Sequence, residues 1–172
     1  KKIFYSSVYE AELAKLFSNA WRYIQFSVAN QFYMMCENND INYYNVKNIM
    51  TTGYDRSKDI PIAGFTAGPC LLKDTMQLSA FNGGNFLLGQ AAMNINEGLP
   101  HFIVEKLKNN FKLKTKIVGI LGMSFKAGID DIRDSLSYKL GKILKFNGCK
   151  VLFSDEYVKD KTFTSKKELI KK

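Results

Sequence analysis

The chain has 172 residues, of which 46% are hydrophobic and 13% aromatic, so it can bury a core and is not a disordered segment. Its formal net charge is +9, but the lysines are scattered and no basic motif is interleaved with aromatic residues, so we expect no nucleic-acid partner. No apolar run approaches the roughly 20 residues that cross a bilayer, so we expect no membrane partner.

The number and spacing of the cysteines and histidines argue against a disulfide framework and against a metal site. The three cysteines, Cys36, Cys70 and Cys149, are odd in number and widely spaced, which argues against a disulfide framework and predicts a cytoplasmic protein. His101 is the single histidine, so the spacing of a Cys/His metal site does not occur and we expect no metal. The chain begins at Lys1 without a methionine, and we expect it to be a piece of a longer protein.

A long helix is predicted near the start of the chain, from about Ser7 to Asn38. Ser7 and Glu10 have the spacing of a capping box. Apolar residues then recur at steps of three and four, in a stripe broad enough to predict a central helix packed on more than one side. The stripe consists of Leu13, Leu16, Phe17, Ala20, Trp21, Ile24, Val28, Phe32 and Met35. A second, short helix is predicted from about Tyr43 to Met50.

Lys15 and Asn19 lie one turn apart on the first predicted helix and share a face. Both neighbour the apolar stripe, where a lysine can donate to an oxyanion or to a substrate oxygen. An exposed pair on a solvated surface explains the same spacing, and the pattern alone does not decide between the two.

The stretch from Gly64 to Asp74 combines a glycine-bearing loop, a proline and a cysteine. Pro69 is tolerated in a first helical turn, where its missing N–H would have no partner anyway. Cys70 is then expected at the positive end of a helix, where free N–H groups favour a thiolate, with Asp74 one turn away on the same face. This arrangement suggests covalent catalysis at a carbonyl. The alternative is a buried cysteine after an ordinary loop.

Two further helices are predicted after Cys70. The first ends near Phe81, where an Asn-Gly-Gly-Asn turn follows at residues 82–85. The second is long and covers roughly Phe86 to Phe111. Pro100 lies inside it and predicts a kink or a break near Gly98.

The composition changes at Lys112, where an α/β pattern begins. The run at residues 116–122 is short, apolar and bounded by glycine, which is typical of a buried parallel strand. An amphipathic helix from Asp134 to Phe146 follows, with Gly148 as its stop, and residues 150–154 form a second buried strand. We therefore predict a helical domain over residues 1–112 and the first part of a doubly wound domain over 113–172, with a ligand at the carboxyl ends of its strands.

Four motifs occur in order along the chain, at residues 12–19, 64–74, 119–126 and 130–135. Together they resemble the UDP-glucose/UDP-N-acetylmannosamine dehydrogenase family of NAD-dependent nucleotide-sugar 6-dehydrogenases, over nearly all of residues 8–155. The resemblance implies a mainly α central (dimerisation) domain followed by the start of an α/β Rossmann-like UDP-binding domain. The N-terminal NAD-binding Rossmann domain is expected to be absent, because the sequence has no G-x-G-x-x-G unit.

The resemblance also implies an activity and catalytic residues. The family oxidises C6 of the sugar from an alcohol to a carboxylate in two hydride transfers. Cys70 matches the nucleophile that holds the aldehyde as a thiohemiacetal and then becomes a thioester. Lys15 and Asn19 match the pair that donates to the oxyanion and positions water, and Asp74 matches the carboxylate that organises water and Lys15 for hydrolysis.

Substrate and cofactor contacts follow from the same resemblance. The loop from Pro61 to Ala67 matches the segment that clasps the sugar diphosphate, and Arg56 resembles an arginine that reaches the substrate of a neighbouring subunit. The residues matched to substrate are Lys15, Asn19, Arg56, Ile62, Ala63, Gly64, Phe65 and Lys126, and those matched to cofactor are Cys70, Lys73 and Arg133. We expect a UDP-sugar substrate, a homodimer, and NAD bound mainly by a domain missing from this chain, which alone is expected to be inactive.

Two other interpretations remain open at this point. A relative of the 6-phosphogluconate or 3-hydroxyacid dehydrogenases shares a helical domain and a Lys-x-x-x-Asn pair, but simple alcohol oxidation needs no thiol, so Cys70 discriminates against it. A non-catalytic module, either a helical dimerisation domain or a basic nucleic-acid binder, would use the long amphipathic helices or the positive charge alone.

Overall fold

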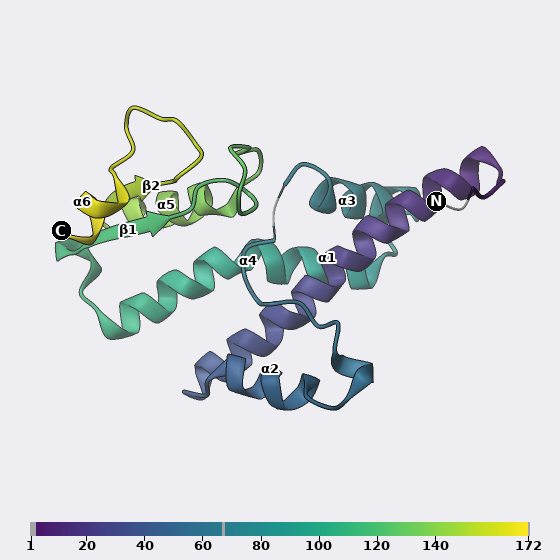
Figure 1. Ribbon diagram of the computed structural model, residues 1–172, viewed down its shortest axis with the longest axis horizontal. Coiled ribbons are helices and arrows are strands. Elements are labelled where there is room, and N and C mark those ends of the chain that lie inside the picture. The colour runs from purple at the N-terminus through teal and green to yellow at the C-terminus, as the bar shows by residue number, and fades with distance from the viewer. Residues whose placement is uncertain (1–2, 67, 172) are drawn as a thin grey trace. The chain divides into compact units, whose positions relative to one another are not determined.

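The computed structural model describes residues 3–66 and 68–171 (Figure 1). The chain divides into two compact units, one formed by Lys1–Ala63 and Cys70–Ile95 and the other by Gly64–Pro69 and Asn96–Lys172. The division falls inside helix α4 (Leu87–Asn110), which contributes residues to both units. Among the described residues, no helix has the length and apolar character needed to cross a membrane. The domain boundary that the composition predicts at residue 112 stays a prediction.

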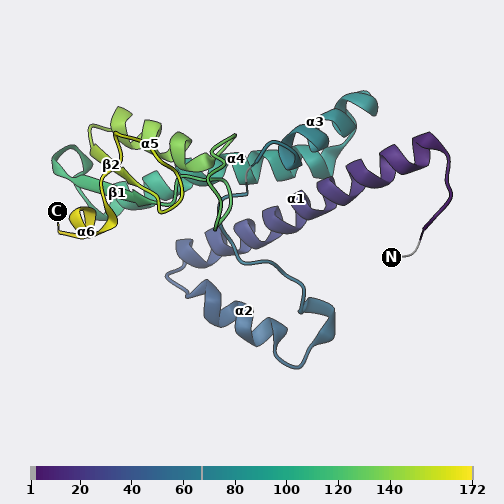
Figure 2. The same cartoon turned by 45° about the horizontal axis from the view of Figure 1, so that its top comes forward.

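The first unit is built on helix α1 (Val8–Asn38), which confirms the long helix predicted from the apolar period. The capping box is also confirmed, since the Ser7 Oγ accepts the Glu10 N–H at 3.3 Å and the Glu10 carboxylate accepts the Ser7 N–H at 2.7 Å. Helix α2 (Tyr43–Thr51) folds back against α1 (Figure 2), and the short 3-10 helix η1 (Asp55–Ser57) follows. Helix α3 (Leu71–Phe81) packs along α1.

One face of α1 is open to solvent in the single chain. The exposed members of the predicted stripe are Phe17, Trp21, Val28, Phe32 and Met35. The prediction that α1 is packed on more than one side is therefore wrong for one chain taken alone. The reason is that α2 and α3 are too few elements to surround a helix of 31 residues.

Helix α4 runs through Pro100 without interruption, so of the kink or break predicted near Gly98 the break does not occur. A proline removes the one hydrogen bond that its N–H would donate to the carbonyl of the fourth residue before it. Burial on both sides compensates, because Asn96, Leu99 and Val104 are all buried and hold this stretch in the helix. The 3-10 helix η2 (Leu113–Thr115) follows α4.

The second unit contains a parallel pair of strands, β1 (Ile117–Leu121) and β2 (Lys150–Ser154), joined by helix α5 (Leu136–Phe146). Ile117 pairs with Lys150 and Leu121 with Ser154, which confirms the predicted βαβ arrangement. Its core consists of Val104, Leu113, Ile120, Met123, Leu144 and Cys149. Gly148 has a φ of +84° just past α5, as expected of a helix stop.

Two details of this unit differ from the sequence prediction. Helix α5 begins at Leu136, two residues later than predicted, because Asp134 has a φ of +53° that no helix continues. The strands are not fully buried, since Ile117 and Leu121 are 46% and 54% exposed. The cause is the short helix α6 (Lys166–Ile170), whose Leu169 covers only the middle of that face, above Gly119.

The contact between α5 and β2 requires a glycine at position 141. A Cβ placed on Gly141 would lie 2.6 Å from Cε1 and 2.7 Å from Cζ of Phe153. The Phe153 ring packs against the rings of Tyr138 and Phe163, so it has little room to yield. We expect Gly141→Ala to lower the free energy of unfolding by about 1 kcal/mol, because overpacking outweighs the gain in helix propensity. Urea unfolding measures the change, with the exposed Lys142→Ala on the same helix as control. Equal stability of both variants would contradict this account.

Candidate functional site

A hollow between α1 and α3 brings together most of the residues that the sequence singles out as catalytic. Its volume is about 650 Å³. The lining residues are Ala11, Glu12, Lys15, Leu16, Cys70, Lys73, Asp74 and Gln77. All of them belong to the first unit, and the two helices that carry most of them pack directly on one another. Two lysines, two carboxylates and a thiol therefore share one open cavity.

Asn19 joins this group through Asp74. Its Nδ2 donates to Oδ2 of Asp74 at 2.5 Å, and both side chains are buried. The Lys73 ammonium lies 3.1 Å from the other carboxylate oxygen, Oδ1. Burial by itself raises the pKa of Asp74, but the hydrogen bonds from Asn19 and Lys73, with the charges of Lys73 and Lys15, outweigh it and hold that pKa below its ordinary value. Asp74 is thus a buried anion between two helices.

Cys70 is the N-cap residue of α3 and is exposed. Its carbonyl accepts the Asp74 N–H at 2.9 Å, which places the two residues one turn apart as the sequence predicts. The alternative of a buried cysteine is therefore wrong. Pro69 lies one residue before the N-cap, so its predicted place in the first helical turn is also wrong. The first intrahelical bond reaches back only to Cys70.

The geometry of the hollow suits nucleophilic chemistry. The Cys70 thiol is exposed at the start of α3, where a substrate can reach it. The exposed Lys15 lines the same cavity and can donate to an oxygen that becomes negative. Asp74 is ionised and fixed, so it can orient a donor or a water molecule without leaving its place.

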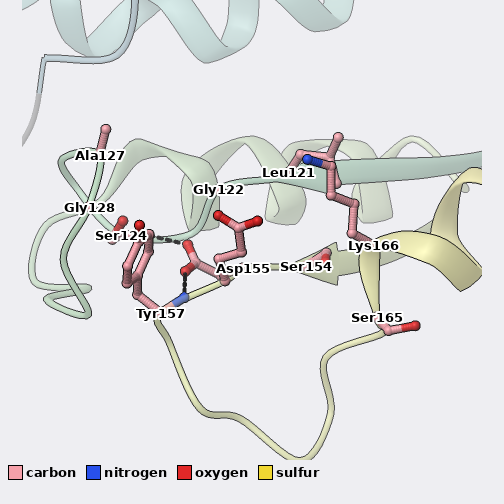
Figure 3. Close-up of a pocket in the computed structure, with 11 residues that line it drawn as sticks. Leu121, Gly122, Ser124, Ala127, Gly128, Ser154, Asp155, Tyr157, Ser165 and Lys166 are labelled. Atoms are coloured by element: carbon pink, nitrogen blue, oxygen red, sulfur yellow. Dashed lines mark hydrogen bonds between the residues drawn. The ribbon is translucent and has the colours of Figure 1, made fainter.

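A second pocket, of about 390 Å³, lies at the carboxyl ends of β1 and β2 in the second unit (Figure 3). Here Asp155 ties two loops together by accepting four backbone N–H groups. They come from Met123 at 2.7 Å, Ser124 at 3.2 Å, Tyr157 at 2.7 Å and Val158 at 3.0 Å. Burial acts to raise the pKa of Asp155, but these four bonds outweigh it and lower that pKa.

The pocket lies where the βαβ pattern predicts a ligand. The sequence did not single out Asp155, Tyr157, Ser165 or Lys166 as lining residues, although an Asp directly after a strand is a signal for this edge of a sheet. Ser165 and Lys166 could not be found in this way, because they return to the pocket from the start of α6.

The remaining predicted residues lie elsewhere. Arg56, on η1, lines a different hollow of about 380 Å³ against α1, together with Trp21. Ile62 is exposed and Ala63 half-buried, both in the first unit, whereas Gly64 and Phe65 belong to the second. Ala67 lies outside the described residues, so the predicted loop from Pro61 is described only as far as residue 66.

Two predicted residues belong to the loop between β1 and α5. The Lys126 side chain is exposed. The Arg133 side chain is 69% exposed, and its guanidinium donates to the Asp131 carboxylate at 2.6 Å. The Arg133 hydrogen bonds lower the pKa of Asp131. Both cations are therefore on the surface, and neither is locked into the core.

Comparison with known proteins identifies the family. Residues 9–98 match the model of the UDP-glucose/GDP-mannose dehydrogenase family, central domain, and residues 119–171 match the UDP binding domain of the same family. The chain belongs to this family. The two matched regions correspond to the helical part and to the Rossmann-like part that the sequence motifs indicate, so the recognised family and fold class are confirmed.

Individual proteins similar to this chain are also dehydrogenases of this family. The chain is 30% identical over 163 residues to a UDP-N-acetyl-D-mannosamine dehydrogenase of Pyrococcus horikoshii, covering 92% of this chain and 39% of that protein. It is 31% identical over 156 residues to a UDP-glucose 6-dehydrogenase of Haloferax volcanii, covering 87% and 36%. A solved UDP-N-acetylmannosamine dehydrogenase structure from Pyrococcus horikoshii superimposes with a TM-score of 0.84 at 31% identity, over 98% of this chain and 41% of that one. The chain thus spans about two fifths of the length of these relatives.

The buried carboxylate at position 74 predicts a pH dependence of stability. Its pKa is lowered in the folded state, so its stabilising contribution is complete above the ordinary value of about 3.9 and is lost as the pH falls through the lowered value. We expect Asp74→Asn to cost about 1–3 kcal/mol at pH 7, because a neutral amide presents an NH₂ group to Asn19 and loses the charge of the pair.

Urea unfolding between pH 7 and pH 3 measures this effect. The wild-type chain should lose stability more steeply below about pH 4 than Asp74→Asn does. Asp55→Asn is the matched control. The Asp55 side chain is 96% exposed, and its ion pair with Lys58 is long, at 3.7 Å, so it should add little to stability. Parallel pH profiles for wild type and Asp74→Asn would show that the anion at position 74 does not stabilise the fold.

Proposed function

We propose that this chain supplies the substrate-oxidising residues of an NAD-dependent nucleotide-sugar 6-dehydrogenase, which converts the C6 alcohol of a UDP-sugar to a carboxylate. The observation that carries the proposal is the exposed Cys70 thiol in one hollow with Lys15 and the buried Asp74 anion. The family to which the chain belongs consists of dehydrogenases, and its second matched region is a UDP binding domain. Relatives carry the names of dehydrogenases of UDP-glucose and of UDP-N-acetyl-D-mannosamine.

The thiol accounts for the second oxidation, which is the difficult one. The Cys70 sulfur adds to C6 of the aldehyde, and the carbonyl oxygen becomes the oxyanion of a thiohemiacetal, which the Lys15 ammonium stabilises. Loss of the remaining C6 hydrogen as hydride leaves a thioester on Cys70. Water then adds to this carbonyl, the C–S bond breaks, and the carboxylate product and the free thiol are released. Asn19, held by Asp74, positions the water.

NAD, when bound, supplies the acceptor for both hydrides. Among the described residues, two exposed cations suit the diphosphate of NAD. The Lys73 and Arg133 side chains are 68% and 69% exposed and offer positive charge to a diphosphate. We propose that they and Cys70 are this chain's contacts to the cofactor. The sequence holds no glycine-rich dinucleotide turn. We propose that residues outside this chain supply most of the binding of NAD.

For the UDP-sugar, we propose that the binding residues are those that the sequence motifs match to substrate. We propose that Lys15, Asn19 and Lys126 contact the sugar, and that the segment from Ile62 to Phe65 contributes its backbone to the diphosphate. Both lysines are exposed, so their charges are available to a ligand. Arg56 is proposed to act on the substrate of a neighbouring subunit, since it lies at a hollow separate from that of Cys70.

The proposal is tested by following NADH formation with UDP-glucose and with UDP-N-acetylmannosamine. A longer protein that contains this chain should form NADH and the uronic acid, whereas the 172-residue chain alone should form none. Cys70→Ser in the longer protein should lower uronic acid formation at least about a hundredfold, because the hydroxyl is a far weaker nucleophile. Cys36→Ser, at a half-buried cysteine of the same unit, is the control. Full activity of Cys70→Ser would refute covalent catalysis, and turnover by the 172-residue chain would refute the expected inactivity.

We also propose a homodimer formed by the open face of α1. Phe17, Trp21, Val28, Phe32 and Met35 recur along this helix, whose length is about 46 Å at 1.5 Å per residue. Their exposed fractions run from 37% at Phe32 to 60% at Trp21. A continuous apolar stripe of this length is unusual on a monomer and is self-complementary when two copies cross on a two-fold axis.

Light scattering of the chain across micromolar concentrations tests the dimer. Trp21→Glu should shift the mass from dimer to monomer, because a buried unpaired carboxylate at the crossing costs several kcal/mol. Phe146→Glu is the matched control, since Phe146 is 92% exposed but lies at the end of α5 in the other unit. A wild-type chain that stays monomeric at every concentration would refute the dimer.

A further inference from the structure

Gly68 lies directly against the aromatic ring of Phe125. A Cβ placed on Gly68 would be 2.7 Å from Cδ2 and 2.9 Å from Cε2 of that ring, closer than atoms can approach. Gly68 also has a φ of +103°, which residues with a side chain rarely adopt. Both residues belong to the second unit, because the segment Gly64–Pro69 packs with it and not with the helices around it in the sequence. Only glycine permits this contact.

Phe125 is itself firmly placed. Its N–H donates to the Asp131 carbonyl at 3.0 Å, and the preceding N–H, of Ser124, donates to the Asp155 carboxylate at 3.2 Å. The Ser124 hydroxyl closes the turn by donating to the Lys126 carbonyl at 2.8 Å. The backbone on either side of the ring is therefore fixed, and Asp155 links it to the end of β2.

Cys70, in contrast, has little of its own to hold it. It is exposed, and as the N-cap of α3 it makes no side-chain capping hydrogen bond. Among the residues that the structure describes, its backbone carries one hydrogen bond, which its carbonyl accepts from the Asp74 N–H. The position of the thiol therefore depends on the residues that enter the helix, and Gly68 lies two residues before Cys70.

We propose that Phe125 is a positioning residue for Cys70 and acts by packing on Gly68, two residues earlier in the chain. The consequence for catalysis rests on the proposed role of Cys70, but the contact and its effect on the first turn of α3 do not. Removing the ring frees Gly68 from its left-handed conformation, and the bond between the Cys70 carbonyl and the Asp74 N–H then opens more often.

Amide hydrogen exchange on the complete 172-residue chain tests this directly. Phe125→Ala should raise exchange of residues 64–74 about tenfold and leave β2 unchanged, since the opening is local. Phe125→Tyr should restore slow exchange, because it keeps the ring atoms Cγ, Cδ2 and Cε2 that lie nearest Gly68. Phe146→Ala, which removes an exposed ring from the same unit, is the control and should change neither region.

A double-mutant cycle separates the contact from general destabilisation. Gly68→Ala should raise exchange of residues 64–74 strongly in the wild-type background and much less in Phe125→Ala, because the added methyl group then has no ring to meet. Additive effects, or unchanged exchange in Phe125→Ala, would overturn the proposal. If Phe125→Ala unfolds the unit, so that β2 exchanges faster too, Phe125→Leu replaces it in the same cycle. None of these outcomes depends on the enzymatic activity, so the proposed function can fail while this inference holds, and the reverse.

Discussion

The arrangement of the first unit depends on one buried hydrogen bond, between Asn19 on α1 and Asp74 on α3. The two residues are 55 positions apart in sequence, and their bond fixes how far α3 slides along α1. Lys15 lies one turn before Asn19, and Cys70 lies one turn before Asp74. The same bond therefore aligns the amine and the thiol at one hollow. Burial raises the pKa of the Asp74 carboxylate, and the hydrogen bonds from Asn19 and Lys73 lower it. The alignment of the two helices and the low pKa therefore depend on the same hydrogen bond from Asn19.

The second unit also contains a carboxylate that is held by hydrogen bonds, but the donors differ from those of Asp74. Asp155 is also partly buried and ionised, but its partners are four backbone N–H groups instead of a lysine and an amide. Backbone donors come from fixed loops, so this carboxylate is held by geometry that a change of nearby side chains leaves intact. It joins the loop after β1 to the loop after β2 at the edge where a parallel sheet offers a ligand site. In both units a carboxylate that carries little chemistry of its own organises the residues around it.

Much of this could be predicted from sequence, because it is local. The apolar periodicity of α1, its capping box and the glycine stop after α5 each depend on residues close together in the sequence. Each of these predictions is confirmed. The open stripe of α1 and the half-exposed strands could not be predicted, because a pattern shows which residues are apolar but not how many elements are present to cover them. Lys15, Asn19, Cys70 and Asp74 were each visible within a short motif. The bond that brings the two motifs together was not, since it joins side chains from distant parts of the chain.

Burial distinguishes the three cysteines more sharply than their spacing does. Cys149 lies in the core of the second unit, where burial raises its pKa and keeps it as the neutral thiol. Cys36 is half-buried near the end of α1. Only Cys70 is exposed, at the point where a helix begins and beside a hollow that contains two lysines. A nucleophile must be reached by its substrate, and burial in the core keeps a substrate away from Cys149. Cys70, the cysteine proposed as the nucleophile, is therefore also the one that the fold leaves most open to a ligand.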